Sequence, residues 1–191
     1  MFHTFIVRDY FKNQKSEKGI YYSMVKIFVT GLPGCGKTTL TKDIAKLLKD
    51  SGINTSGFIT EEVRTKGFRQ GFTIEDLRTG EKLIFASVEQ ISNIKFGKYF
   101  LNIQNFEKIA LNAFENTQIV LIDEIGKMEF YSRSFKYYLF KNLGKDINLI
   151  ATLHRDFVKD FSHYEILTLT RENYNPIKEK ILIELKANSI L

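Results

Sequence analysis

The sequence predicts an α/β fold, a three-layer, doubly wound and mainly parallel sheet with helices on both faces. Three observations lead to this prediction. Apolar, strand-like runs alternate along the chain with amphipathic, helix-like stretches. A glycine-rich turn, Gly31–Thr38, stands between the first strand and the first helix. A near-continuous aliphatic run, Gln118–Asp123, is typical of a parallel strand that is buried on both faces.

The first half of the chain is predicted to begin with a strand and a helix and to end in a hairpin. Asp50-Ser51-Gly52 ends the helix, and Arg78-Thr79-Gly80 supplies the hairpin turn. The stretch that runs from the hairpin to Asn102 has no clear pattern. The predicted elements are a strand over Val25–Thr30, a helix over Lys37–Lys49, a strand over Ile53–Arg64, and a hairpin of Phe68–Asp76 with Lys82–Ser87.

The second half alternates helices and strands. Its first helix has an apolar stripe that includes Phe106, Ile109 and Phe114, which is more typical of a core than of a binding surface. The aromatic residues of its second helix suit core packing better than base stacking, and Pro176 suits a first helical position. The predicted elements are a helix over Ile103–Asn116, a strand over Gln118–Asp123, a helix over Phe130–Asn142, strands over Asn148–Leu153 and Glu165–Thr170, and a helix from Asn175-Pro176 to Lys186.

The length of 191 residues suits one buried α/β domain and is short for two. Met24 stands just before the first core strand, where a domain of this type would begin. Lys12–Gly19 is polar and rich in lysine, as in a linker. We therefore predict a domain over residues 24–191. Residues 1–23 are predicted to be an extension that is either poorly ordered or upstream of the native start.

The composition favours a chain without a membrane span and without disulfides. No run approaches the roughly 18 apolar residues that cross a bilayer. The single cysteine, Cys35, excludes an internal disulfide and suits a reducing, cytoplasmic setting. The net charge of +6 suits a phosphate-rich ligand, but the scattered lysines favour a solvated surface. The charge permits a nucleic-acid contact without arguing for one, and the oligomeric state is left open.

The glycine-rich turn has the pattern of a phosphate-binding loop, also called Walker A. Its glycines can take positive φ and let phosphate oxygens approach backbone N–H groups, while the following helix adds its positive end. Lys37 supplies charge to the β- and γ-phosphates, and Thr38 offers a hydroxyl to Mg²⁺. The alternative is a turn that only joins a strand to a helix. The predicted nucleotide-binding residues here are Gly31, Leu32, Pro33, Gly34, Cys35, Gly36, Lys37, Thr38 and Thr39.

The aliphatic run Ile119–Ile122 ends in two acids, in the manner of a Walker B strand. Because parallel strands present ligand sites at their carboxyl ends, Asp123 is predicted to hold Mg²⁺ opposite the phosphate loop. Glu124 is predicted to orient or deprotonate an attacking water, which makes Glu124 and Lys37 the expected catalytic residues. The alternative is that either acid caps the helix that follows.

A carboxylate aimed at water favours hydrolysis of a nucleoside triphosphate over transfer to another acceptor. The two alternatives are a nucleotide or nucleoside kinase, and a slow NTPase switch that a partner regulates. Charge that develops on the γ-phosphate also requires a cation besides Lys37. Four arginines near predicted strand ends are candidates to supply it in cis: Arg64, Arg69, Arg155 and Arg171.

Four further motifs resemble the thermophile-type nucleoside-triphosphatases, also called cancer-related NTPases, of the P-loop superfamily. They are Gly57–Arg64, Gly67-Phe68-Arg69, Asp123–Glu129 and Leu169–Asn173. The resemblance covers residues 24–186, and the extension before Met24 departs from it. It implies a RecA-like strand arrangement. It also implies Mg²⁺-dependent hydrolysis of ATP, GTP and other nucleoside triphosphates to diphosphate and phosphate, with loose base selectivity.

The resemblance also implies further site residues. Thr152 matches a strand-end threonine that is expected either to sense the γ-phosphate or to cap a helix, and residues 171–175 are expected beside the base. The second nucleotide-binding segment that the resemblance implies consists of Ile119, Val120, Leu121, Ile122, Asp123, Glu124, Ile125 and Gly126.

Overall fold

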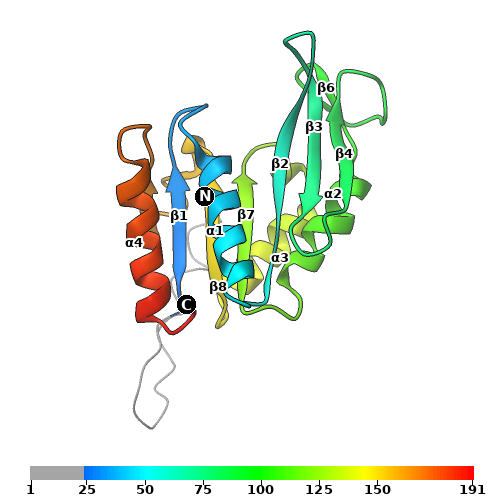
Figure 1. The fold of residues 1–191 in the computed structure, drawn as a ribbon. Coiled ribbons are helices and arrows are strands. Elements are labelled where there is room, and N and C mark those ends of the chain that lie inside the picture. The colour runs from blue at the N-terminus through cyan, green and yellow to red at the C-terminus, as the bar shows by residue number, and fades with distance from the viewer. Residues whose placement is uncertain (1–23) are drawn as a thin grey trace.

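The computed structural model describes residues 24–191, which form a nine-stranded sheet between two layers of helices (Figure 1). The predicted extension over residues 1–23 lies outside the described residues. The strands are β1 (Lys26–Thr30), β2 (Thr55–Thr65), β3 (Phe68–Asp76), β4 (Lys82–Ser87), β5 (Lys95–Phe96), β6 (Tyr99–Leu101), β7 (Ile119–Ile125), β8 (Asn148–Leu153) and β9 (Glu165–Thr168). The α-helices are α1 (Lys37–Asp50), α2 (Ile103–Ala110), α3 (Arg133–Leu143) and α4 (Tyr174–Ala187), and the 3₁₀ helices are η2 (Asn112–Phe114), η3 (Glu129–Tyr131) and η4 (Arg155–Phe157).

The strand order is β5-β6-β4-β3-β2-β7-β8-β1-β9. Strands β2, β7, β8, β1 and β9 pair in parallel, and β3, β4, β6 and β5 extend the sheet in antiparallel pairs. The sheet is therefore mixed, with a parallel half and an antiparallel half that meet at β2. Numbered in chain order, the five parallel strands lie in the order 5-1-4-3-2, which is the RecA-like arrangement that the resemblance implies.

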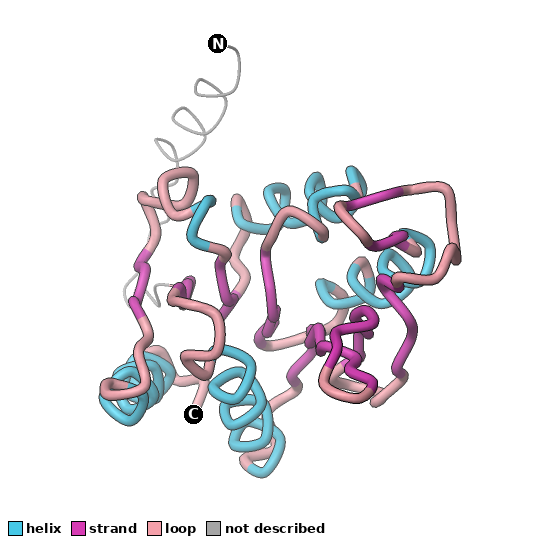
Figure 2. Tube along the Cα trace, turned by 90° about the horizontal axis from the view of Figure 1, so that it is seen from above, coloured by secondary structure: helices cyan, strands magenta, loops and turns pink. Residues whose placement is uncertain are grey.

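Two apolar clusters, one on each face of the sheet, confirm the predicted three layers. Helices α1 and α4 cover one face, and α2 and α3 cover the other (Figure 2). Alternate residues of β7 enter opposite clusters, with Ile119 and Leu121 on the α1 side and Val120 and Ile122 on the α3 side. Because β7 is buried on both faces, its sequence is aliphatic throughout. None of the helices within residues 24–191 is long and apolar enough to cross a membrane.

The aromatic residues of the predicted helices belong to the core, as expected. The Phe106 ring of α2 lies against the Phe135 ring of α3, with centroids 5.2 Å apart and planes nearly perpendicular. Phe58 of β2 contacts both rings at 5.5 and 5.6 Å. These edge-to-face contacts are favourable beyond the area that they bury. They join α2 and α3 to the strand at the boundary of the two sheet halves.

Two predicted helices are interrupted. The helix predicted over Ile103–Asn116 ends at Ala110, and a separate 3₁₀ turn follows it. The helix predicted over Phe130–Asn142 is divided at Ser132, whose hydroxyl accepts a hydrogen bond of 2.9 Å from the backbone N–H of Phe135. A serine in this position is a strong N-cap, so α3 begins at Arg133. The spacing of apolar residues, from which the longer helix was predicted, carries no information about this local hydrogen bond.

Smaller boundary differences occur elsewhere. The last helix begins at Tyr174 rather than at Asn175, and β9 ends two residues before the predicted Thr170. The stretch without a clear pattern contains the short strands β5 and β6. Their lengths of two and three residues are too small for an alternation of polar and apolar residues to be seen.

A glycine allows β2 to approach β7 where the two strands pair. A Cβ atom on Gly57 would lie 1.7 Å from the carbonyl oxygen of Leu121, and the φ of +132° is also unfavourable for other residues. We expect Gly57→Ala to lower the free energy of unfolding by about 3 kcal/mol or more, because the strands must separate. Urea unfolding measures this loss.

Gly80→Ala is the matched control for that measurement. Gly80 has a φ of +75° in an exposed turn, and no atom lies within 4 Å of the position of its Cβ. The Gly80→Ala substitution adds only backbone strain, which should lower the free energy of unfolding by about 1 kcal/mol. Equal losses in the two variants would show that the close contact between β2 and β7 does not decide the stability.

Candidate active site

The phosphate-loop pattern and the two acids meet at the carboxyl ends of the parallel strands. The loop joins β1 to α1, and the acids lie at the end of β7, with β8 between β1 and β7 in the sheet. The hydroxyl of Thr38 donates a hydrogen bond of 2.6 Å to Oδ2 of Asp123, although the two residues are 85 positions apart in the sequence. The edge of the sheet where open α/β folds bind ligands therefore contains both motifs.

The loop itself has the backbone that the glycine pattern predicts. Gly34 and Gly36 have φ values of +74° and +108°, in the region that favours glycine. Lys37 folds back over the loop, and its Nζ donates to the carbonyl oxygen of Gly31 at 3.2 Å. Cys35 is buried, and its N–H donates to the carbonyl oxygen of Leu32 at 3.2 Å. These two hydrogen bonds hold the loop in a compact turn at the start of α1.

Asp123 is almost fully enclosed, with 2% of its surface exposed. Its Oδ1 accepts a hydrogen bond of 2.5 Å from the hydroxyl of Thr152, in addition to the bond from Thr38. Burial raises the pKa of Asp123, and the two hydroxyl hydrogen bonds oppose that rise. Thr152 therefore orients a carboxylate, and the side chain that caps the following 3₁₀ helix is that of His154.

Glu124 lies next to the phosphate-loop lysine. Its Oε1 is 3.9 Å from Nζ of Lys37. Burial raises the pKa of Glu124, the charge of Lys37 lowers it, and the charge of Asp123 raises it further. Neighbours in a regular strand point to opposite faces, yet both acids line the same cavity. A register shift between Ile122 and Ile125 in the pairing of β7 with β8 accompanies this arrangement.

Two adjoining cavities lie above these residues. The inner cavity, of about 580 Å³, is lined by Lys37, Thr38, Asp123 and Glu124 together with residues of β3 and of the loops after β7 and β8. The outer cavity, of about 850 Å³, lies between Pro33 and Gly34 of the phosphate loop and the β2–β3 hairpin. Their volumes fall within the usual range for small-molecule sites.

The other predicted nucleotide-binding residues divide into positions that line a cavity and positions that do not. Gly31, Gly36, Thr39 and Gly126 line the inner cavity. The side chains of the remaining predicted positions lie outside both, either exposed, as for Leu32, or buried in the core clusters or the loop: Cys35, Ile119, Val120, Leu121, Ile122 and Ile125. The buried positions support the site by fixing the strand and the loop.

The four candidate arginines have different surroundings. Arg69 lines both cavities, Arg64 only the outer one, and Arg155 only the inner one. Arg171 lines neither, and its Nε donates to the carbonyl oxygen of Gly34 at 3.3 Å. The segment predicted to lie beside the base thus packs against the outside of the phosphate loop.

Glu129 is one of four carboxyl residues that line the inner cavity, with Glu62, Asp123 and Glu124, and its sequence position predicts no role for it. It is 7% exposed, and burial raises its pKa to about 8, with the charges of Glu124 and Asp123 adding to the rise. Gly126 leaves room for it, because a Cβ there would lie 2.7 Å from Oε2 of Glu129. An acid that follows a methionine carries no signal of burial in the sequence, so only the fold, in which Glu129 begins η3, reveals it.

Known proteins match this chain over almost all of the described region. A family model described as NTPase matches residues 26–182. This chain belongs to that NTPase family. The nucleoside-triphosphatase THEP1 of Methanocaldococcus jannaschii is 42% identical over 168 residues, which cover 85% of this chain and 98% of that protein. The THEP1 of Thermotoga sp. strain RQ2 is 37% identical over 174 residues, covering 86% and 97%.

Two solved structures share the fold of this NTPase-family chain. THEP1 from the hyperthermophile Aquifex aeolicus superposes with a TM-score of 0.70 at 35% identity and covers 81% of this chain and 95% of its own. The solution structure of a human cancer-related nucleoside triphosphatase superposes with a TM-score of 0.71 at 29% identity and covers 85% and 98%. The family resemblance and the α/β fold predicted from the motifs are both confirmed.

The buried carboxyl of Glu129 generates a prediction about pH and stability. Its pKa is about 8 in the folded chain and 4.5 ordinarily, so between these values the folded state keeps a proton that the unfolded state releases. The free energy of unfolding therefore falls as the pH rises through this window. We expect Glu129→Gln to remove on the order of 2 kcal/mol of that fall between about pH 5 and about pH 8.

Urea unfolding at the two pH values measures the effect. Glu179→Gln, the same change on the exposed surface of α4, is the control and should leave the pH dependence as it is in the wild type. A Glu129→Gln variant with the wild-type pH dependence would show that Glu129 is ionised in the folded chain at neutral pH.

Proposed function

We propose that this chain hydrolyses nucleoside triphosphates, ATP and GTP among them, to diphosphate and phosphate in a magnesium-dependent reaction. The observation that carries the proposal is the approach of Glu124 to Lys37, at 3.9 Å, beside the contact between Thr38 and Asp123. A phosphate-binding cation and a carboxylate suited to activate water thus line one cavity. The relatives that carry the name nucleoside-triphosphatase support the same activity.

Different residues of the chain bind the phosphates and transfer the proton. The backbone N–H groups of the phosphate loop and the ammonium of Lys37 bind the β- and γ-phosphates. A water oxygen forms a bond to the γ-phosphorus, the bond from phosphorus to the bridging oxygen breaks, and the diphosphate leaves with the electron pair. Glu124 accepts a proton from the water and passes it to the released phosphate. The raised pKa of Glu124 suits this exchange.

Thr38 and Asp123 are the residues that would hold Mg²⁺. Hydroxyl and carboxylate oxygens are the ligands that this ion prefers, and the burial that raises the pKa of Asp123 favours a cation beside it. Within residues 24–191 no group of three or more His, Cys, Asp or Glu side chains is suited to enclose a metal. This agrees with an ion that takes its other ligands from phosphate and water. When bound, it neutralises charge on the phosphate oxygens.

Replacing Glu124 tests the proton acceptor. We expect Glu124→Gln to lower kcat for phosphate release by about 100-fold to 1,000-fold, because the amide cannot accept the proton. Its affinity for a fluorescent nucleotide should stay within about threefold of the wild-type value, because the phosphate loop is unchanged. Lys37→Ala should lose both binding and turnover.

A panel of ATP, GTP, CTP and UTP, each with and without Mg²⁺, measures the activity and the base preference together. Following the labelled γ-phosphate in the presence of nucleosides and nucleoside monophosphates separates hydrolysis from a kinase reaction. Label in an acceptor rather than in free phosphate would overturn the proposal. Full turnover by Glu124→Gln would remove Glu124 from the mechanism.

Thr38 allows a separate test of the metal site. Thr38→Ala removes the hydroxyl that contacts Asp123, so we expect the Mg²⁺ concentration for half-maximal turnover to rise by about tenfold or more. Thr38→Ser keeps the hydroxyl and should behave like the wild type. Titration of phosphate release with MgCl₂ makes the comparison. An unchanged magnesium requirement in Thr38→Ala would contradict the assignment of that ligand.

A further inference from the structure

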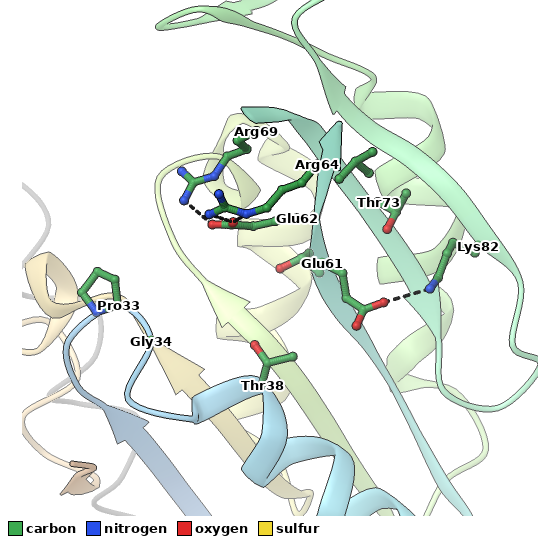
Figure 3. A pocket seen from close by; sticks show the side chains of 11 residues that line it. Pro33, Gly34, Thr38, Glu61, Glu62, Arg64, Arg69, Thr73 and Lys82 are labelled. Atoms are coloured by element: carbon green, nitrogen blue, oxygen red, sulfur yellow. Dashed lines mark hydrogen bonds and ion pairs between the residues drawn. The ribbon is translucent and has the colours of Figure 1, made fainter. Parts of the chain in front are cut away.

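The β2–β3 hairpin faces the phosphate loop across the outer cavity with a pair of arginines. Figure 3 shows Arg64, Arg69 and Glu62 together on the hairpin, opposite Pro33 and Gly34. Both guanidinium groups pair with the one carboxylate of Glu62. Two positive charges held by a single negative charge leave an excess of one positive charge on this wall. That excess favours an anionic ligand between the hairpin and the loop.

Arg69 has an unused hydrogen-bond donor beside the site. Its Nε is buried and has no acceptor among the described residues, a condition that only one other buried side-chain atom of residues 24–191 shares, the hydroxyl oxygen of Thr30. A buried donor without a partner costs about 1–3 kcal/mol, so a movement of the Arg69 side chain that brings Nε to a ligand oxygen is favourable. Guanidinium donors bind phosphate oxygens in a paired, directional manner.

A β-bulge and an aromatic ring fix the position of this guanidinium. The pairing of β2 with β3 shifts register between Val63 and Arg64, so that Gln70 is an extra residue and Arg69 pairs with Arg64. In a regular strand, Arg69 and Phe72 would point to opposite faces, since they are three positions apart. Here the guanidinium lies 5.4 Å from the centre of the Phe72 ring. Phe72 also lines the inner cavity, as the two acids do.

The other three candidate arginines fit the site less well. Arg64 reaches only the outer cavity, where its Nε donates to Glu62 at 2.8 Å. Arg171 is engaged by the carbonyl oxygen of Gly34 outside both cavities. Arg155 is exposed on η4. Only Arg69 of these four combines a place in both cavities with an unpaired buried donor.

We propose that Arg69 is the arginine that this chain supplies in cis to the terminal phosphate of a bound nucleotide. The inference rests on the proposed function. Arg69 makes and breaks no covalent bond, and its guanidinium stabilises the charge that builds on the γ-phosphate oxygens as the bond to the leaving diphosphate breaks. Glu62 is its positioning residue, which holds the guanidinium until the more highly charged polyphosphate replaces the carboxylate as its partner.

Phosphate release by Arg69→Ala tests the inference. We expect kcat to fall by about 100-fold or more, while affinity for ADP stays within about threefold, because the charge is needed only at the terminal phosphate. Arg69→Lys keeps the charge without the planar fork and should remain at least about tenfold slower than the wild type. Retained ADP binding shows that each variant is folded.

A second readout reports the transition state directly. The wild type should retain labelled ADP in the presence of Mg²⁺ and aluminium fluoride, which mimics the transferred phosphoryl group, and Arg69→Ala should not. Arg133→Ala removes an exposed arginine at the start of α3, outside both cavities, and controls for the change in net charge. Arg64→Ala, on the same hairpin, should lose clearly less in kcat than Arg69→Ala, because Arg64 lines only the outer cavity.

The outcomes separate the two proposals. If the wild type hydrolyses triphosphates and Arg69→Ala does so equally fast, Arg69 has no part in the reaction and the proposed function still stands. An equal loss in Arg64→Ala would assign the effect to the charge of the hairpin and overturn the assignment to Arg69. A wild-type chain that releases no phosphate while binding nucleotide would overturn the proposed function itself.

Discussion

The carboxylate of Asp123 is the point at which the fold and the candidate site depend on each other. Its two oxygens accept hydrogen bonds from Thr38, at the start of α1, and from Thr152, on β8. A buried carboxylate is unfavourable unless donors or cations surround it, so these bonds fix how α1, β7 and β8 meet. The same residues lie where a metal-bound phosphate would sit. The sheet register that satisfies Asp123 is therefore the register that forms the site.

The site lies where the parallel and antiparallel halves of the sheet join. Strand β2 belongs to both, because Thr55–Ile59 pairs with β7 and Phe58–Thr65 pairs with β3. The residues that pair with β7 are largely buried, whereas the far end of β2 is exposed and continues into the hairpin. The parallel half supplies the loop and the acids. The hairpin supplies an opposite wall that the parallel strands alone do not have.

The parts of the site that could be predicted are those with a local cause. Glycine spacing determines the turn before α1. A buried parallel strand can be recognised from its aliphatic run, and the acids that end the run mark its carboxyl end. Arg69 and Glu129 were different. The surroundings of Arg69 depend on a bulge between two strands, and the burial of Glu129 depends on the packing of η3. Both are set by tertiary contacts. The break before α3 was not predicted, although its cause is local. The hydroxyl of Ser132 caps α3, and this hydrogen bond sets the start of the helix despite the helical spacing of the apolar residues before it.

The cations of the site are paired with carboxylates of the chain in a way that prepares the site for a polyphosphate. Lys37 lies beside Glu124, Arg69 pairs with Glu62, and Lys42 and Lys82 share Glu61. Each cation is thereby held near the cavities by a carboxylate, and Lys37, the least exposed of the four, is not left without a counter-charge, which would be unfavourable. An arriving triphosphate carries more negative charge than any one of these carboxylates. In the proposed reaction it replaces these carboxylates as the partner of Lys37 and Arg69 instead of meeting bare cations, and Glu124 is then free to act on water.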